Sequence, residues 1–377
     1  MNTEKNVSII IPSYNRGEIL KNTLLSLKRQ TYQDSLIQII LINDGSRDNT
    51  RQLVNEMGIP NLEYLENSHN KGAGIARNLG LQVAEGDIII FCDSDFIVPE
   101  TYVSNHVKEH MNNDKIVVSG MGHWHYILTY DFADAWLPFQ KNDLQPMYND
   151  PFIKERMLKG PNLINEEDIH QGDFSKFVCI PRWLKSWVNM FEEIISEYGE
   201  NLKNFELPWL TFCTGNLSVN RDYLKSFGGF DTNFKRHEDW ELGYRLYKDE
   251  CAFKFAVDAE AYQQLAPQNP KVTQTQKTTY KLLSTKHPNI DILLLSLVLK
   301  AGYSFKKISD VLRQHKEVSD FHKTLTNNFE GMLRTYINEI PYENKVKKGK
   351  NRKNLRKIRH RFPEWYNSYT ALHKREI

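Results

Sequence analysis

Apolar and polar positions follow two different periods along the first hundred residues of the chain. Short apolar runs rich in β-forming residues predict strands at residues 7–12, 36–42, 62–66 and 87–92. The segments between them have helical spacing, with apolar faces made by Ile19, Leu20, Leu24 and Leu27 and by Ile75, Leu79 and Val83. This alternation predicts an α/β fold, a mostly parallel sheet with helices on both faces.

Polar residues follow three of these predicted strands. Pro12 to Asn15 come after the first strand, Asn43 to Ser46 after the second, and Asp93 to Asp95 after the fourth. In an open α/β sheet, ligands bind at the carboxyl ends of the strands, so we expect the three clusters to meet at one site. The sequence therefore indicates a nucleotide-binding site.

Two common kinds of nucleotide-binding site fit the sequence poorly. NKGAGIARNLG (70–80) opens a helix after the third strand, and Gly72 and Gly74 resemble part of a dinucleotide fingerprint. Arg77 stands where the third glycine would be, which disfavours a dehydrogenase. The motif GxxxxGK[ST] is absent from the sequence, which disfavours a P-loop NTPase.

Six motifs occur in the order and spacing of one enzyme family. They are VSIIIPSYNR, IILINDGSRDNT, NKGAGIARNLG, IIIFCDSDFIVP, TGNLSVNRDYLKSFGGFD and HEDWELGYRL. Over residues 6–265 the chain resembles a family 2 glycosyltransferase of the GT-A type. That resemblance implies a GT-A-like (Rossmann-like) fold and transfer, with inversion, of a sugar from a UDP-sugar to a hydroxyl of a saccharide or glycan. It also implies a role in the synthesis of surface polysaccharide or glycoconjugates.

The resemblance assigns the donor site to residues at the first strand ends. Asp44 would accept the imide proton of uracil, and Pro12 and Tyr14 would line the base pocket. The other donor-binding residues it implies are Gly72, Arg77, Asp93 and Ser94. Asn43, where many relatives have Asp, could simply form the turn NDGS. Arg77 could face the nucleotide or pair with acids of the surface.

Asp93, Ser94 and Asp95 form a DxD motif, which in this family binds a divalent cation. Such an ion, Mn²⁺ or Mg²⁺, neutralises charge on the departing diphosphate. The resemblance implies that Asp95 binds the ion and that Asp93 contacts the ribose or the metal and its water shell. Gln263 occupies the place of the family's metal-ligand histidine, and its amide oxygen is a weaker ligand than imidazole. His123 and His125, on one face of a strand, could replace that histidine or serve in packing or acceptor contacts.

The pair Glu238–Asp239 begins a predicted helix after the glycine turn FGGFD. An inverting transfer needs a base that takes the proton of the acceptor hydroxyl, and the resemblance gives that role to Asp239. It gives acceptor binding to Glu238, and we assign Gly215, Asn216 and Trp240 to the acceptor site as well. The alternative is a pair of acids that serve only at a helix start. Glu241 and Arg245, four residues apart, are expected to pair.

We predict three parts of the chain: residues 1–115 as the sugar-nucleotide half, 116–265 as the acceptor and catalytic-base half, and 266–377 as a helical extension with a basic tail. The acceptor half is rich in aromatic residues, which could stack on sugars, although most are expected in the core. Residues 130–152 are expected to form a mobile loop over the site. The extension is expected to dock on the catalytic domain or to pair with another copy.

The net charge of +2 hides an uneven distribution. From Pro341 onward, twelve Lys or Arg face three Asp or Glu, a net charge of +9, which leaves −7 for the rest. The tail could attract an anionic membrane or be a solvated basic helix; nucleic acid is disfavoured because no fold for base readout is present. The composition, the four scattered cysteines and the lack of a signal-like N-terminus or a spanning apolar run predict a cytoplasmic protein. Contact of the tail with a membrane would make it peripheral at the inner membrane face.

A second class of function is compatible with the sequence. The missing metal-site histidine would suit a catalytically weak scaffold that binds sugar nucleotides or glycans and acts through its helical extension.

Overall fold

The computed structural model describes residues 4–120, 125–132, 135–267, 272–338 and 358–374. The chain forms two compact units, one made of Met1–Lys203 and Pro208–Val272, the other of Asn204–Leu207 and Thr273–Ile377. Every strand among the described residues belongs to the first unit.

The first unit is built on a seven-stranded sheet with the order β3-β2-β1-β4-β8-β6-β9. Its strands are β1 (Val7–Ser13), β2 (Ile37–Asn43), β3 (Leu62–Glu66), β4 (Ile88–Cys92), β6 (Ile116–Ser119), β8 (Asn216–Asn220) and β9 (Ala252–Phe255). The four strands β3, β2, β1 and β4 run parallel, as do β6 and β9, while β8 is antiparallel to both its neighbours. The four predicted strands and the mostly parallel α/β fold are therefore confirmed.

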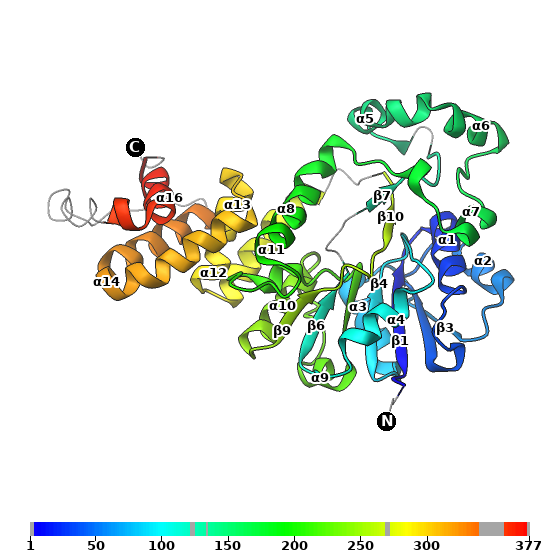
Figure 1. Cartoon of the computed structure of the whole chain (residues 1–377), viewed down its shortest axis with the longest axis horizontal. Helices are drawn as coiled ribbons and strands as arrows, with labels where there is room; N and C mark the ends of the chain where they lie inside the picture. The colour runs from blue at the N-terminus through cyan, green and yellow to red at the C-terminus, as the bar shows by residue number, and fades with distance from the viewer. Residues whose placement is uncertain (1–3, 121–124, 133–134, 268–271, 339–357, 375–377) are drawn as a thin grey trace. The chain divides into compact units, whose positions relative to one another are not determined.

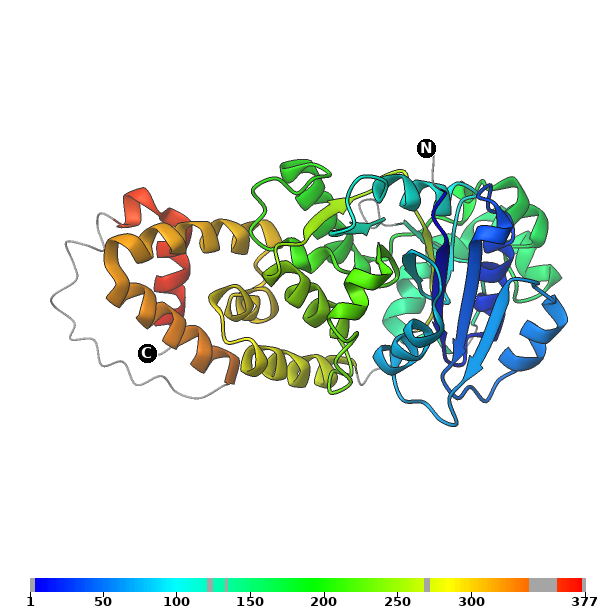
Figure 2. The same cartoon turned by 90° about the horizontal axis from the view of Figure 1, so that it is seen from below.

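Helices lie on both sides of these strands, which is clearest in Figure 2. They include α1 (Gly17–Leu27), α2 (Thr50–Met57), α3 (Ala73–Val83), α4 (Tyr102–Glu109), α9 (Arg221–Ser226) and α10 (Glu238–Lys248), with short 3₁₀ turns at Asp34–Leu36, Ser175–Phe177 and Pro208–Thr211. The predicted apolar face of α1 is confirmed, because all four of its residues are buried.

The apolar face predicted for α3 is not the most buried side of the helix. Ile75, Leu79 and Val83 are only half-buried, and the fully buried positions are Gly74, Ala76, Arg77, Gly80 and Leu81. The reason is a close approach of helix and sheet: a Cβ at Gly80 would come within 2.8 Å of Ile10 and 2.9 Å of Ile42. Small residues therefore take the inner face, and one buried arginine lies among them.

A second, three-stranded sheet has the order β5-β10-β7, with β5 at Phe96–Ile97, β7 at His125–Ile127 and β10 at Tyr262–Gln264. Strand β10 is antiparallel to β5 and parallel to β7, and Gln263 pairs with Phe96. This small sheet brings a segment from the end of the first unit beside the residues that follow β4.

The segment expected to be a mobile loop folds into helices instead. It contains α5 (Pro138–Asn149) and the start of α6 (Pro151–Lys159), followed by α7 (Glu166–Gln171) and α8 (Arg182–Tyr198). Leu144 and Ile153 are fully buried in a hydrophobic cluster with Trp136 and Phe177. The loop prediction failed because these apolar side chains, spread among turn-forming residues, provide a core of their own.

The second unit consists of helices, as predicted. They are α11 (Val272–Lys286), α12 (Ile290–Leu293), α13 (Leu295–Ala301), α14 (Phe305–Asn338) and α16 (Pro363–Lys374). Helix α14 is kinked at His322, where φ is −154° and ψ is 74°. Figures 1 and 2 both show α16 (red) beside α14 (orange), and Trp365 of α16 is fully buried there.

Most of the basic run lies outside the described residues, so its contact with a membrane and the pairing of extensions stay predictions. None of the described helices is both long and apolar enough to cross a bilayer.

Candidate active site

Asp44, at the end of β2, anchors the loop that leads into α3. Its carboxylate accepts hydrogen bonds from the side chain of Asn67 (2.8 Å) and from the backbone nitrogens of Lys71 (3.1 Å) and Gly72 (2.8 Å). Gly72 has φ of 101° and ψ of 155°, backbone angles that favour glycine. Asp44 is only 3% exposed, so it fixes this loop, and its contact with uracil stays a prediction.

The other residues at the ends of β1 and β2 are either exposed to solvent or hydrogen-bonded within the fold. Tyr14 is 42% exposed and Pro12 is half-buried, so both rings border solvent where a base could lie. Asn43 is buried and accepts from Ser46 N (2.9 Å) while donating to the Tyr64 hydroxyl (2.7 Å). Its role as a turn residue is therefore confirmed.

Asp93 and Asp95 follow β4 and lie close enough to interact electrostatically. Burial, and after it the charge of Asp93, raises the pKa of Asp95 to about 6. The positive charge of Arg16 opposes this rise in pKa. Ser94 between them is nearly buried, and its carbonyl accepts a hydrogen bond from Thr23 (2.9 Å). Two neighbouring carboxylates repel each other, and a bound cation would relieve that repulsion.

Gln263 is the third possible metal ligand at this place. Its side-chain nitrogen donates to Asp95 Oδ2 over 3.2 Å. Two carboxylates and an amide are hard oxygen donors, and Mg²⁺ typically takes one or two carboxylates together with phosphate oxygens of the substrate, so these residues fit such an ion. No group of three or more His, Cys, Asp or Glu among the described residues could hold a metal.

The suggested replacement by two histidines is only partly visible. His123 lies outside the described residues. The ring of His125 stacks on Tyr262, with centroids 5.2 Å apart, and its Nε2 lies 3.4 Å from Glu260. These contacts place His125 in packing against Tyr262 and beside Glu260.

The acidic pair opens α10, and Asp239 is half-buried there. Its Oδ1 accepts from the backbone nitrogen of Trp240 at 2.8 Å. Burial, and next the neighbouring charge of Glu238, raises the pKa of Asp239 to about 7, against the opposing effect of Arg77. A carboxylate whose pKa lies near neutrality is suited to accept a proton at physiological pH.

His237 precedes the acidic pair and has a left-handed backbone, with φ of 55° and ψ of 25°. Such a conformation is uncommon for a residue with a side chain, and it occurs often at functional sites. The imidazole stacks on Trp240 with centroids 4.5 Å apart, and burial lowers the pKa of His237 to about 3. A neutral ring, half-buried and stacked on Trp240, thus lies at the start of the helix.

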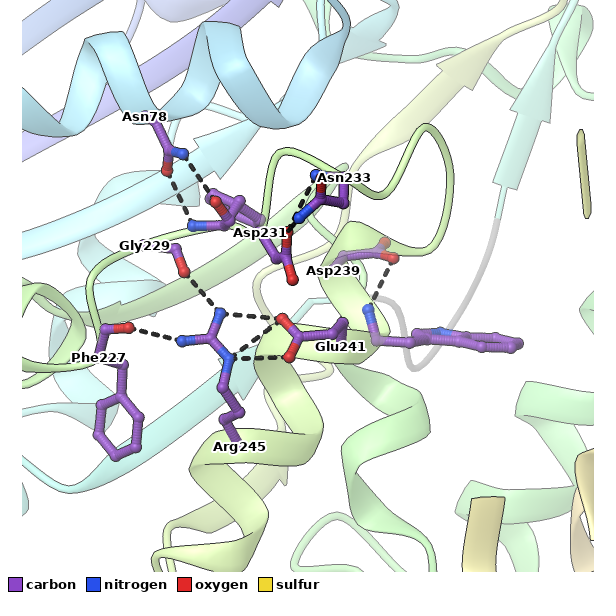
Figure 3. Close-up of polar contacts among 10 residues, drawn as sticks. Asn78, Phe227, Gly229, Asp231, Asn233, Asp239, Glu241 and Arg245 are labelled. Carbon is purple, nitrogen blue, oxygen red and sulfur yellow. Dashed lines mark hydrogen bonds and ion pairs between the residues drawn. The ribbon is translucent and has the colours of Figure 1, made fainter. Parts of the chain in front are cut away.

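The glycine turn before α10 is tied down on both sides, as Figure 3 shows. Asn78 of α3 donates to Phe230 O and accepts from Phe230 N, both over 2.8 Å. Arg245 binds the carbonyls of Phe227 and Gly229, both over 2.6 Å, and pairs with Glu241 over 3.0 Å. The predicted pairing of Glu241 and Arg245 is therefore confirmed, and it shapes the turn that carries the acids.

Arg77 lies between the donor-side and acceptor-side acids. One guanidinium nitrogen is 2.7 Å from Asp93 Oδ1, and the other is 2.8 Å from Glu238 Oε1. Burial disfavours the charged guanidinium, but Asp93 and Glu238 outweigh it and raise the pKa of Arg77. Of the two alternatives for Arg77, pairing on the surface is wrong, since its side chain is 4% exposed, and contact with the nucleotide stays a prediction. Arg77 connects the two predicted halves of the site.

The remaining predicted acceptor residues are largely buried. Asn216 is fully buried, where it accepts from His106 and donates to Ala259 O, each over 2.8 Å. A Cβ at Gly215 would lie 2.8 Å from Phe96, so only glycine fits there. Trp240 is 3% exposed and stacks on half-buried Trp187. Their contacts with an acceptor stay predictions, and what the structure gives them is a packing role.

The predicted residues thus come together, because Asp239 interacts electrostatically with both Arg77 and Asp93. Sequence reasoning missed three residues of the site. Asn67 binds Asp44, Asn78 binds the turn before α10, and Arg16 acts electrostatically on Asp95. Two of them lie inside quoted motifs, SYNR and IARNLG, which was the available signal.

Comparison with known proteins agrees with this arrangement of fold and site. The sequence profile described as Glycosyl transferase family 2 matches residues 8–166. An uncharacterised glycosyltransferase of Bacillus subtilis, YfnE, is 30% identical over 301 residues, covering 78% of this chain and 74% of YfnE. The chain belongs to glycosyl transferase family 2, and it is a glycosyltransferase.

Two further proteins extend the comparison. Chondroitin synthase of Pasteurella multocida is 25% identical over 304 residues, covering 79% of this chain and 29% of that protein. A mannosyltransferase of Pyrobaculum calidifontis, solved with GDP-Man and Mn²⁺, aligns with a TM-score of 0.50 and 13% identity over 100% of this chain and 88% of that one. This structural likeness shows a shared fold.

Proposed function

We propose that this glycosyltransferase moves a sugar from a UDP-sugar to a saccharide hydroxyl with inversion at the anomeric carbon, and that Asp239 is the general base. The observation that supports this most is the pKa of Asp239, raised to about 7 in a half-buried position that interacts with Asp93. A base with such a pKa is deprotonated in a large fraction of molecules near neutral pH.

In this reaction Asp239 takes the proton of the acceptor hydroxyl. The hydroxyl oxygen then forms its bond to the anomeric carbon, while the bond from that carbon to the diphosphate oxygen breaks and its electron pair leaves with UDP. Glu238 accepts a hydrogen bond from the acceptor and is held in place by Arg77, over 2.8 Å. The clamped turn before α10 keeps both acids in position, which matters because small displacements cost much of the rate.

Asp95, Asp93 and Gln263 are the residues that would hold a divalent cation, with Asp93 also near the ribose. When bound, Mn²⁺ or Mg²⁺ would neutralise negative charge on the diphosphate. Arg16, whose charge acts on Asp95, adds positive charge on the same side.

Uracil is the proposed base, and Asp44, Pro12 and Tyr14 form its pocket in this proposal. The solved mannosyltransferase carries GDP-Man, so guanine is the competing base that the experiment must include. A polysaccharide or glycoconjugate is the proposed product, which the similarity to a chondroitin synthase supports.

The test is release of nucleotide diphosphate from a panel of UDP- and GDP-sugars with Mn²⁺, Mg²⁺ or EDTA. We expect turnover with at least one UDP-sugar, dependent on metal. Asp239→Asn should lower transfer by about 10²- to 10⁴-fold while leaving UDP affinity unchanged. Asp222→Asn, an exposed Asp on α9, is the matched control and should keep full activity. Near-normal turnover by Asp239→Asn would show that another group is the base.

A further inference from the structure

Two consecutive residues of α3 hold the segment that carries the acidic pair. Asn78 binds the backbone of Phe230 in both directions, and Arg77 binds Glu238. Only Arg77 also reaches the donor side, through Asp93. One side chain thus touches a residue of each proposed substrate site.

The environment of Arg77 leaves it few other partners. Its guanidinium carbon lies 5.7 Å from the centre of the Phe230 ring, and its Nε is buried with no hydrogen-bond partner among the described residues. Water cannot compensate a charge in such a place, so the two carboxylates share the neutralisation of the guanidinium. The two carboxylates bind different nitrogens of one charge, so a change of charge at one carboxylate alters how strongly the guanidinium attracts the other.

We propose that Arg77 couples the two substrate sites, so that binding of the donor fixes Glu238 for the acceptor. When Asp93 binds the sugar nucleotide, its attraction for the guanidinium weakens. The guanidinium then binds Glu238 more strongly and holds that carboxylate in one orientation. Arg77 thus acts as a positioning residue. This inference rests on the proposed roles of Asp93 at the donor and Glu238 at the acceptor.

The coupling can be measured without any acceptor, because coupling between two sites is reciprocal. Without the charge of Glu238, Asp93 is the one remaining charged partner among the two carboxylates that bind Arg77. Arg77 should then attract Asp93 more strongly, and Asp93 should be less available to the nucleotide. We expect Glu238→Gln to weaken the binding of UDP with Mn²⁺, measured by calorimetry on the full chain, by about fivefold or more. In an Arg77→Met background the same substitution should change the affinity less than about twofold.

Two controls separate coupling from other effects. Lys248→Gln removes an exposed charge from the end of the same helix, away from the turn, so UDP affinity should not change. Asn78→Ala loosens the same turn without altering charge, and Glu238→Gln should retain its effect in that background. If Arg77→Met does not fold, Arg77→Lys, with one cationic group in place of the fork, should reduce the effect of Glu238→Gln.

The coupling is wrong if Glu238→Gln leaves UDP affinity unchanged, or if Lys248→Gln weakens it equally. In either case wild-type sugar transfer would leave the proposed function standing. Failure of the wild type to release nucleotide from any sugar nucleotide would instead overturn the proposed function, and the coupling with it.

Discussion

The side chain of Gln263 donates to Oδ2 of Asp95 over 3.2 Å, and the next residue, Gln264, donates its backbone nitrogen to the carbonyl of Asp95 over 2.7 Å. Strand β10 is thus bonded to the second acid of the DxD motif through a side chain and through the backbone. Position 263 is therefore fixed beside the proposed cation.

Exchange of Gln263 for histidine tests whether this position serves the metal. An imidazole is a better ligand for Mn²⁺ than an amide oxygen, so Gln263→His should lower the Mn²⁺ concentration needed for half-maximal UDP binding, on the order of tenfold. Gln263→Ala should raise it. A metal titration of UDP binding measures both, and equal titrations for the two variants would remove Gln263 from the metal site.

The pH profile of transfer follows from Asp239. Its pKa is raised to about 7, and only the deprotonated carboxylate can accept a proton, so kcat/KM should fall as pH drops below 7, about tenfold per unit. The charge of Glu238 contributes to that high pKa, so Glu238→Gln should shift the acidic limb to lower pH. An acidic limb in the same place in both proteins would contradict this assignment of the base.

Two buried histidines should make stability depend on pH. His106 and His110 both bond Ser218 Oγ, over 2.9 and 2.8 Å, and burial lowers the pKa of His106 to about 4 and of His110 to about 3. The unfolded chain therefore binds more protons below about pH 6.5, so stability present above that pH is lost as pH falls toward the folded pKa values. Each histidine contributes at most about 1.4 kcal/mol per pH unit.

Urea unfolding between pH 5 and 7 can isolate this contribution. The raised pKa values of Asp95 and Asp239 act in the opposite direction, so wild type must be compared with His110→Gln, which does not titrate. We expect a smaller loss of stability toward pH 5 in the variant. Parallel pH dependences would show that His110 is not the titrating group.

Helix α16 should be needed for the stability of the second unit. Trp365 is fully buried, donates its indole nitrogen to His315 over 3.1 Å and packs edge-on to Phe329. Trp365→Ala should cost about 3–5 kcal/mol of unfolding free energy. Thermal unfolding would measure this, with Tyr366→Ala, a partly exposed neighbour, as the control. A truncation before this helix would therefore damage the unit, and charge substitutions in the basic run are the better test of membrane contact.

Four of the seven strands of the sheet could be predicted from the sequence, and three of them, β1, β2 and β4, are nearly continuous apolar runs followed by polar residues. Asp44, Asp93, Asp95 and Asp239 could be located because motif order places them at strand ends and at one helix start. Periodicity failed for α3, where contact with β1 and β2 requires glycine and alanine in place of large apolar residues. It failed again at residues 130–152, where turn-forming residues mask a local core.

The partners of Arg77 and Asn78 could not be predicted from local sequence. Glu238 and Phe230 lie more than 150 residues away along the chain, and no local pattern indicates such contacts. The burial of Arg77 becomes clear only from the structure, which shows this residue on the inner face of α3.

Helix α3 binds Phe230 through Asn78 and Glu238 through Arg77, so the two segments must be compatible in sequence with each other. Chimeric enzymes that join the first half of one family member to the second half of another would separate the two partners. Such hybrids should become active only when residues 70–80 and 227–245 come from the same parent, whichever parent supplies the rest of the sheet.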